Sequence, residues 1–460
     1  MLKQLFIVWE WLAGKMQTIS RAVRPCRVSL FVVVLGAWVI VGVVQSGEGL
    51  AALCDRFGTP EFAIFALGNL WWGGTSWYLA RAMLRFAFPG AKAIPPHDRW
   101  LHRRVARWLP RALGVAPLLA VSIGFWRCPA DPRLARASSL LMAALAALFG
   151  LFLYVRRPLL CKLKERMAPG AGRLLASSWQ DLDQLYDATL TEIRQLPMIT
   201  RWLLVGHVLI SFSFFLLYAA VPVVAAQALG APTVLVLSLS AWIACGSIVT
   251  YASSWLRAPI SLYLLALALL LSRFVDNHQA TPRTSSPPAA RQPIGGLRGD
   301  FAQWRTLNGL DEQEPFIVVA AEGGGIRAAY WTAAILGGLQ DLQPTFAAHL
   351  YAVSSVSGGS LGAATFSALL ASDENSRYQQ RAKQILRHDF LAPPLARMLY
   401  TDLVQRFLPF GVSALDRGAA LERAWTEAFA EQNLLSFARP FDSFWAAPHA
   451  ALPRLFLNST

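Results

Sequence analysis

Long apolar runs without charge occupy the first 275 residues, whereas the later residues mix apolar and polar positions. An apolar run of about 18 residues or more crosses a bilayer as a helix, because every backbone polar group must find its partner within the segment. Six runs are predicted as membrane helices: residues 28–45, 62–80, 109–126, 137–155, 202–226 and 234–255. A seventh, residues 258–272, is short, and its flanking residues Arg257 and Arg273 can extend their side chains to the interface.

The seventh run decides on which side of the membrane the C-terminal half lies. Six spans leave that half on the side of the N-terminus, and seven place it on the opposite side. Hydropathy favours seven spans. A helix that lies along the interface, with leucine and isoleucine side chains in lipid, is the alternative.

Basic residues alternate between the loops that join these runs. The first 27 residues hold five Lys and Arg, the segment after the first run holds one, residues 81–111 hold eight, residues 127–136 hold three and residues 156–201 hold eight. Since basic loops stay in the cytoplasm, the pattern predicts a multi-pass protein of the plasma (inner) membrane with a cytoplasmic N-terminus. The formal net charge of +15 is explained by this topology, and without a recognisable nucleic-acid-binding module we expect no nucleic-acid partner.

Cysteine usage argues against a metal or redox centre. The five cysteines form no CxxC pair, and none lies in the last 200 residues, so we expect neither a zinc site nor a cofactor. The topology places Cys54 and Cys128 on the outer side, either as a disulfide or, as we prefer, as two unpaired thiols. His207 lies inside an apolar run and is either functional or a neutral imidazole bonded to a backbone carbonyl.

The composition divides the chain into four parts. Residues 1–27 form a cytoplasmic segment, residues 28–275 a transmembrane helical domain, residues 276–299 a flexible linker rich in Pro, Ser and Arg, and residues 300–460 an α/β domain. Within the helical domain, apolar residues between Leu175 and Ile193 recur every three or four positions and predict one helical face. This face packs on neighbouring helices of the chain, on the bilayer surface or on a partner subunit, which makes a homo-oligomer one alternative.

The stretch "PFIVVAAEGGGIRAA" predicts a strand at residues 316–320, a glycine turn, and a helix that begins near Ala328. Three adjacent glycines before a helix let backbone N–H groups converge on an anion. Gly323, Gly325 and Ala328 also fit a dinucleotide fingerprint. That interpretation requires an acidic residue at the end of the next strand, and the candidate strand at residues 350–355 ends in serines instead.

A second strand, turn and helix are predicted in "LYAVSSVSGGSLGAATFSALLA", with Ser357 at the bend. A nucleophile elbow needs small neighbours, and Ser355 and Gly359 stand at the two flanking positions. Gly358 follows the serine, and its N–H is directed at the oxygen of an attacked carbonyl. The alternative is that the small residues only allow close packing in a strand–helix turn. The glycine turn one strand earlier favours an acyl-transfer site.

These two motifs together resemble the patatin-like phospholipase family, which pairs a G-G-G-x-R/K loop with a G-x-S-x-G elbow. The resemblance covers residues 316–460 and implies an α/β/α fold, a Ser-Asp dyad, and acyl hydrolysis of membrane lipids without histidine or metal. It assigns the nucleophile to Ser357, the oxyanion hole to the glycine loop and Gly358, and a supporting role to Arg327. The glycine-loop residues concerned are Gly323, Gly324 and Gly325, and Gly359 supports the elbow.

The family's aspartate lies in an Asp-Gly motif, and no Asp-Gly pair occurs in the sequence. An unactivated serine is a weak nucleophile. We expect the α/β domain to be incomplete, with the aspartate beyond Thr460. A catalytically inactive homologue and a triad of Ser357, Asp442 and His449 are the alternatives.

The expected function is a membrane-bound lipid acyl hydrolase of the phospholipase A or lysophospholipase type. A lipid transacylase and a catalytically silent lipid-sensing or interaction module are the alternatives. Between the elbow and the terminus, Leu395, Met398, Leu399, Leu403 and Phe407 predict one apolar face of a helix. This face is either an apolar route for the substrate or part of the domain core, and the spacing favours the core.

Overall fold

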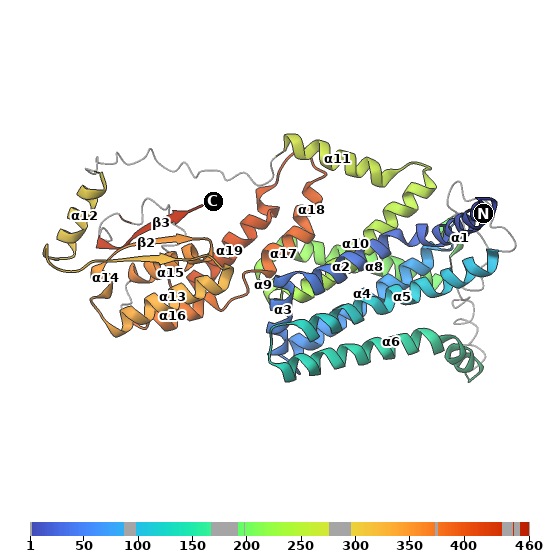
Figure 1. Cartoon of the computed structure of the whole chain (residues 1–460), viewed down its shortest axis with the longest axis horizontal. Helices are drawn as coiled ribbons and strands as arrows, with labels where there is room; N and C mark the ends of the chain where they lie inside the picture. Colours follow the sequence, from blue (N-terminus) through green and yellow to red (C-terminus); the bar gives the residue numbers. More distant parts are fainter. Residues whose placement is uncertain are drawn as a thin grey trace. The chain divides into compact units, whose positions relative to one another are not determined.

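The computed structural model divides the chain into two compact units. The helical unit contains Met1–Asn277 and Ala392–Arg417, and the α/β unit contains His278–Leu391 and Gly418–Thr460 (Figure 1). The residues that the structure describes are 2–86, 98–166, 192–196, 198–275, 296–372, 376–434, 445 and 451–459. The predicted helical face at residues 175–193 lies outside these ranges except for its last residue, Ile193, and most of the predicted linker lies outside them as well.

The helical unit consists of long helices joined by short connections. Its first part contains α1 (Leu2–Val23), η1 (Arg24–Cys26), α2 (Arg27–Gly42), α3 (Val44–Cys54), α4 (Pro60–Met83), α5 (Arg99–Arg127) and α6 (Pro132–Arg166). Its second part contains η3 (Ile193–Gln195), α8 (Met198–Ala220), α9 (Pro222–Leu229), α10 (Ala231–Trp255) and α11 (Ile260–Phe274). The segment from the C-terminal half contributes α17 (Ala392–Leu399), α18 (Thr401–Gln405) and η4 (Ser413–Leu415).

Five helices within the described residues are long and apolar enough to cross a membrane. They span Leu12–Gly42, Arg99–Arg127, Pro132–Arg156, Thr200–Ala220 and Ala231–Trp255. The sequence had predicted six or seven. The run at 62–80 does form a 24-residue helix, α4, but its polar residues make it less apolar than the five. The seventh run forms the 15-residue helix α11, which is shorter than a spanning helix.

Helix α4 lies inside the helical unit, where its polar side chains are buried. Asn69, Thr75 and Ser76 are each at most 1 % exposed. A methyl group on Gly73 would come within 2.5 Å of the carbonyl oxygen of Gly114 on α5, so glycine is needed for this approach. Small residues that let helix backbones come close are typical of helix pairs in membranes.

His207 is bonded to the backbone within α8. Its Nδ1 lies 2.7 Å from the carbonyl oxygen of Leu203, and its ring stacks on Trp71 with 4.4 Å between centroids. This geometry matches the second of the two interpretations made from the sequence. A buried imidazole that donates its Nδ1 proton to a carbonyl and packs between aromatic rings is a structural residue.

A segment from the C-terminal half belongs to the helical unit. Tyr400 packs against Tyr218 of α8 with 5.0 Å between ring centroids, and the indole Nε1 of Trp242 on α10 donates to the carbonyl oxygen of Leu399 at 3.0 Å. Arg397 donates to the carbonyl oxygen of Ala219 at 3.1 Å. The single helical face predicted for this segment is wrong, because the helix is interrupted at Tyr400 (φ −120°, ψ −79°) between α17 and α18.

The α/β unit is built on a three-stranded parallel sheet in the order β1-β2-β3. The strands are β1 (Ile317–Ala321), β2 (Leu350–Val356) and β3 (Arg454–Asn458). The helices are α12 (Gly296–Leu307), α13 (Gly325–Leu342), α14 (Phe346–His349), α15 (Gly358–Leu370), α16 (Tyr378–Leu386) and α19 (Arg417–Ala430). Helix α12 begins four residues before the predicted end of the linker.

The two faces of this sheet carry separate apolar clusters. On one, Leu336 of α13 and Phe366 of α15 pack with Leu350 and Val353 of β2. On the other, Trp304 of α12 packs with Tyr351 and Ala352. This is the layered arrangement expected of an α/β domain.

A partly buried polar contact attaches α12 to the sheet. Arg454 of β3 forms an ion pair with Asp300 at 3.0 Å, and the hydroxyl of Tyr351 donates to the same carboxylate at 3.0 Å. Burial, and then the neighbouring carboxylate, raise the pKa of Tyr351 to about 12, so the phenol stays protonated and keeps donating at neutral pH.

The thiols of Cys54 and Cys128 face each other across the ends of α3 and α5, with 3.8 Å between the two Sγ atoms. Both cysteines are reduced in the structure. Burial raises the pKa of the Cys54 thiol to about 12, so little thiolate is present at neutral pH and spontaneous oxidation is slow.

We therefore predict that added copper–phenanthroline links Cys54 to Cys128 within one chain, because a small movement brings the sulfurs to the bonding distance of about 2.05 Å. Peptide mass mapping under non-reducing conditions measures the bond. Cys245, which is exposed, is the control, and we expect no bond between it and either Cys54 or Cys128. A bond that survives in the Cys54→Ser variant, or that joins different chains, contradicts the prediction.

Candidate active site

The glycine loop and the serine bend follow two neighbouring strands. In the register of the parallel sheet, Ala321 at the end of β1 pairs with Ser355 near the end of β2. Helix α13 begins at Gly325 and helix α15 begins at Gly358. Because the carboxyl ends of parallel strands meet at one edge of a sheet, both helix N-termini point to the same place.

Ser357 has a strained backbone. Its φ of 49° and ψ of −124° lie outside the regions that non-glycine residues normally occupy. Holding a residue in such a conformation costs about 1–3 kcal/mol and is characteristic of functional sites. The strain places the side chain at the outside of the turn, and Ser357 is exposed while Gly358 and Gly359 after it are buried. These are the features of a nucleophile elbow.

The two turns are in direct backbone contact, and each contact requires glycine. A methyl group on Gly358 would come within 1.9 Å of the carbonyl oxygen of Gly325. One on Gly359 would come within 2.5 Å of the carbonyl oxygen of Glu322, and one on Gly323 within 3.1 Å of the Cβ of Ser357. The glycine loop therefore lies beside the serine.

Backbone N–H groups supply the positive potential of the site. The first N–H groups of a helix have no partner within the helix, and its N-terminus carries about half a positive charge. In α15, Ser360 and Leu361 donate to the carbonyl oxygen of Ser357 at 3.0 and 3.4 Å, which closes the turn behind the serine. Gly325 is the first residue of α13 and Gly358 is the first residue of α15. Their N–H groups lie before the first hydrogen bond within each helix, so they are suited to bind an anion.

The helix after the glycine loop begins earlier than the sequence predicted, at Gly325 rather than near Ala328. Gly325 has a φ of 61°, a left-handed conformation that glycine adopts without steric cost. Arg327 therefore lies in the first turn of α13, where its side chain is exposed. Its supporting role in the loop stays a prediction.

The residue at the first position of the elbow, Ser355, is buried and turned toward β3. Its hydroxyl donates to the carbonyl oxygen of Phe456 at 3.4 Å. At this position the side chain therefore lies between β2 and β3.

Asn458 was missed by the sequence analysis. It is at the end of β3, where it pairs with Val356, and its side-chain amide donates to the hydroxyl of Ser354 at 3.1 Å and to the carbonyl oxygen of Ser355 at 3.2 Å. These bonds fix the end of β2 immediately before the bend. The polar residues that follow the apolar run "RLFL" were the available signal.

The acidic residues that follow the bend at Ser357 are distributed over different parts of the chain. Asp389 accepts a hydrogen bond from the N–H of Leu391 at 2.9 Å, and Asp402 forms an ion pair with Arg417 at 3.7 Å in the helical unit. The proposed triad partners Asp442 and His449 lie outside the described residues. Within the described ranges, no acidic or histidine side chain forms a hydrogen bond with Ser357.

Comparisons with family models, with curated proteins and with solved structures found no match.

The backbone contact between the turns can be tested with alanine at Gly358. We predict that Gly358→Ala forces the glycine loop away from the serine and lowers the stability of the α/β unit by about 1–3 kcal/mol, as overpacking does. Thermal unfolding of the purified protein in detergent measures the change. Gly299→Ala is the matched control, because a methyl group at Gly299 meets no atom within 4 Å. Equal unfolding midpoints for the two variants contradict the prediction.

Proposed function

We propose that the protein is a serine-dependent acyl hydrolase that acts on membrane lipids. The observation that carries the proposal is the strained, exposed Ser357 held in backbone contact with a glycine loop. A protein has little reason to keep such strain for packing alone, since a residue with ordinary dihedral angles would connect β2 to α15 at lower cost. The similarity of both motifs to the patatin-like phospholipase family also supports the proposal.

The proposed reaction has two steps. The hydroxyl oxygen of Ser357 attacks the ester carbonyl, and the N–H groups of the glycine loop and of Gly358 stabilise the negative charge that develops on the carbonyl oxygen. The lipid alcohol leaves with a proton, and water then hydrolyses the acyl-enzyme. Transfer of the acyl group to a second lipid alcohol instead of water is the transacylase outcome of the same chemistry.

Activation of the serine requires a base. The resemblance assigns this role to an aspartate in an Asp-Gly motif, which the sequence does not contain.

The proposal of a lipid substrate is supported by the helical unit. Five helices could cross a membrane by length and composition, and they belong to the same chain as the serine. An enzyme attached to the bilayer meets lipid esters at high effective concentration without needing to bind them tightly from solution.

We further propose that the α/β unit works on the outer side of the membrane, which requires the 15-residue helix α11 to cross the bilayer as the seventh span. The C-terminal segment packs at the end of the helical unit where α8 finishes and α10 begins, with Ala392 and Ala396 beside Ala226 and Ala231. The opposite end of α10, roughly 36 Å away along its axis, carries Arg257. Basic residues favour the cytoplasm, which assigns the end near Ala231 to the outside.

A fluorophosphonate probe tests the nucleophile. We predict that it labels the wild-type protein and that Ser357→Ala abolishes the labelling, because the probe requires an activated hydroxyl beside oxyanion donors. In-gel fluorescence measures labelling, and release of fatty acid from phospholipid vesicles measures hydrolysis. Ser360→Ala provides the matched control in the same turn. Failure to label the wild-type protein supports a catalytically silent module and refutes the hydrolase.

Cysteine labelling tests the side of the membrane. In a variant without native cysteines, we predict that a membrane-impermeant maleimide labels Glu422→Cys in intact cells and labels Ser20→Cys only after the membrane is opened. Both native side chains are exposed in the structure, so accessibility depends on the membrane. The reverse pattern places the α/β unit in the cytoplasm.

A further inference from the structure

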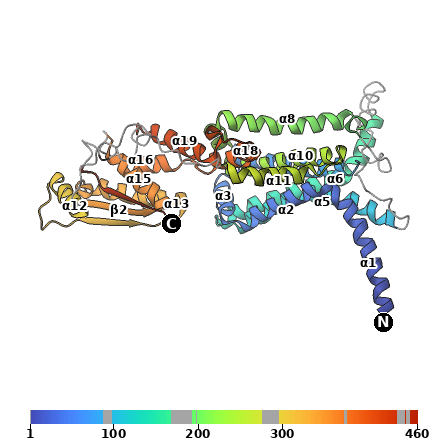
Figure 2. The same ribbon diagram turned by 90° about the horizontal axis from the view of Figure 1, so that it is seen from above.

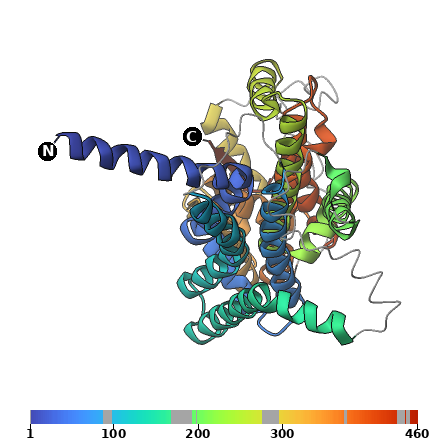
Figure 3. The same ribbon diagram turned by 90° about the vertical axis from the view of Figure 1, so that its right-hand side faces the viewer.

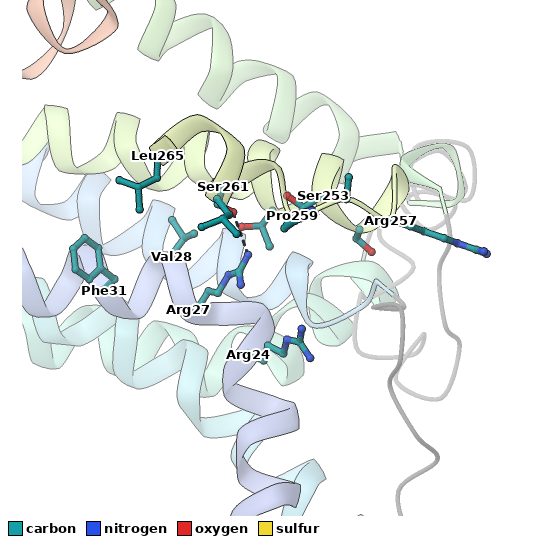
Figure 4. Close-up of a pocket in the computed structure, with 13 residues that line it drawn as sticks. Arg24, Arg27, Val28, Phe31, Ser253, Arg257, Pro259, Ser261 and Leu265 are labelled. Carbon is teal, nitrogen blue, oxygen red and sulfur yellow. Dashed lines mark hydrogen bonds between the residues drawn. The ribbon is translucent and has the colours of Figure 1, made fainter. Parts of the chain in front are cut away.

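A cavity of about 690 Å³ lies in the helical unit between the start of α2 and the turn that joins α10 to α11 (Figure 4). Its volume lies within the range of about 300–1,000 Å³ typical of small-molecule sites. The cavity is distant in sequence from Ser357, and all of its lining residues belong to the helical unit. The proposed hydrolase chemistry does not use it.

One part of the lining is basic and polar. Arg24 and Arg27 stand one helical turn apart, and Figure 4 shows the guanidinium group of Arg27 directed at Ser261, with its Nη2 3.4 Å from the serine Oγ. Ser253 lies nearby, and Arg257 adds a third positive charge at the margin. None of the 13 lining residues is acidic, so the net positive charge of the lining favours an anionic ligand.

The rest of the lining is apolar and follows both helices away from the arginines. Val28 and Phe31 come next on α2, and Leu262 and Leu265 come next on α11. Phe31 is 65 % exposed and Leu265 is 56 % exposed, although they border a cavity (Figure 4). A ligand with a charged end and an apolar end satisfies both parts, whereas a free anion leaves the apolar part empty.

The fold places this cavity at the height of the lipid head groups. At η1, which contains Pro25, helix α1 turns away from the direction of α2 (Figures 2 and 3). The exposed side chains of α1 include Trp9, Leu12, Met16 and Ile19, spaced by three or four residues along one face. A helix with such a face lies along the membrane surface, so we take the bend as the boundary and assign the crossing part of the candidate span Leu12–Gly42 to α2.

The neighbouring helix has an unusual lack of packing. All residues of α11 remain partly or fully exposed, although the helix is mostly leucine and alanine. A lipid held between α2 and α11 supplies the apolar contact that protein side chains do not.

We propose that this cavity binds one anionic phospholipid from the leaflet on the side of the N-terminus. Its phosphate lies between Arg24 and Arg27, which hydrogen-bond phosphate oxygens in fixed geometry. One acyl chain lies along Phe31 and Leu265. The lipid joins α11 to α2, and it is a structural ligand that is distinct from the substrate at Ser357.

Lipid titration of the full chain in detergent, followed by native mass spectrometry, tests this proposal. We expect phosphatidylglycerol to bind at least about tenfold more tightly than phosphatidylcholine, since each arginine near anionic lipid contributes about 1 kcal/mol. The double variant Arg24→Gln/Arg27→Gln abolishes the preference. The matched control is Arg133→Gln/Arg136→Gln, which removes the same charge from exposed positions at the far end of the unit and leaves the preference unchanged.

Three results overturn the proposal: equal binding of the two lipids, equal loss in both double variants, and displacement of the lipid by soluble glycerol phosphate at similar concentration. The last result identifies a site for a free phosphate. If Phe31→Ser weakens the binding of phosphatidylglycerol but not that of glycerol phosphate, the assignment of a lipid is supported. If it weakens the binding of glycerol phosphate but not that of phosphatidylglycerol, the assignment is refuted. The Ser357→Ala variant keeps the lipid preference, which separates this test from that of the hydrolase.

Discussion

The contact between the main chains at Gly325 and Gly358 is the constraint on which the candidate site depends. No side chain larger than hydrogen fits at Gly358, because the carbonyl oxygen of Gly325 occupies the place of a Cβ atom. The contact brings two helix N-termini to one edge of the sheet. It also holds the bend at Ser357 in a conformation that the isolated sequence would not adopt. Positive potential and an exposed hydroxyl thus arise from the same packing event.

The two units use polar groups in different ways. In the α/β unit, Asp300 joins α12 to β3 and to Tyr351 through an ion pair and a hydrogen bond. In the helical unit, the polar residues of α4 are buried, and His207 is bonded to its own helix. Ser76 and His207 are thus bonded to carbonyl oxygens of their own helices, as suits helices in a hydrocarbon environment.

The sequence was most informative where the pattern is local. The β1 and β2 strands and the bend at Ser357 follow from apolar runs that end in glycine and serine, and the structure places them within a residue or two of the prediction. The predicted run at residues 62–80 does form helix α4, but its polar residues lower its hydropathy below that of the five candidate spans. The features that the sequence did not reveal depend on contacts between parts of the chain that are distant in sequence. The break at Tyr400 is invisible to periodicity, since it depends on packing against Tyr218, nearly two hundred residues earlier. Asn458 acquires its partners only through the pairing of β3 with β2.

The contribution of Ala392–Arg417 to the helical unit has a consequence for biosynthesis. Helices that enter the membrane early in translation lack this part of their packing until the ribosome has translated the glycine loop, the bend at Ser357 and the segment Ala392–Arg417 itself. Domains usually fold as units from the N-terminus onward, and here that order is interrupted. Until Ala392–Arg417 packs against the early helices, Tyr218 and Ala231 remain exposed to lipid or to a chaperone. Packing of the early helices is therefore complete only after this segment has been synthesised.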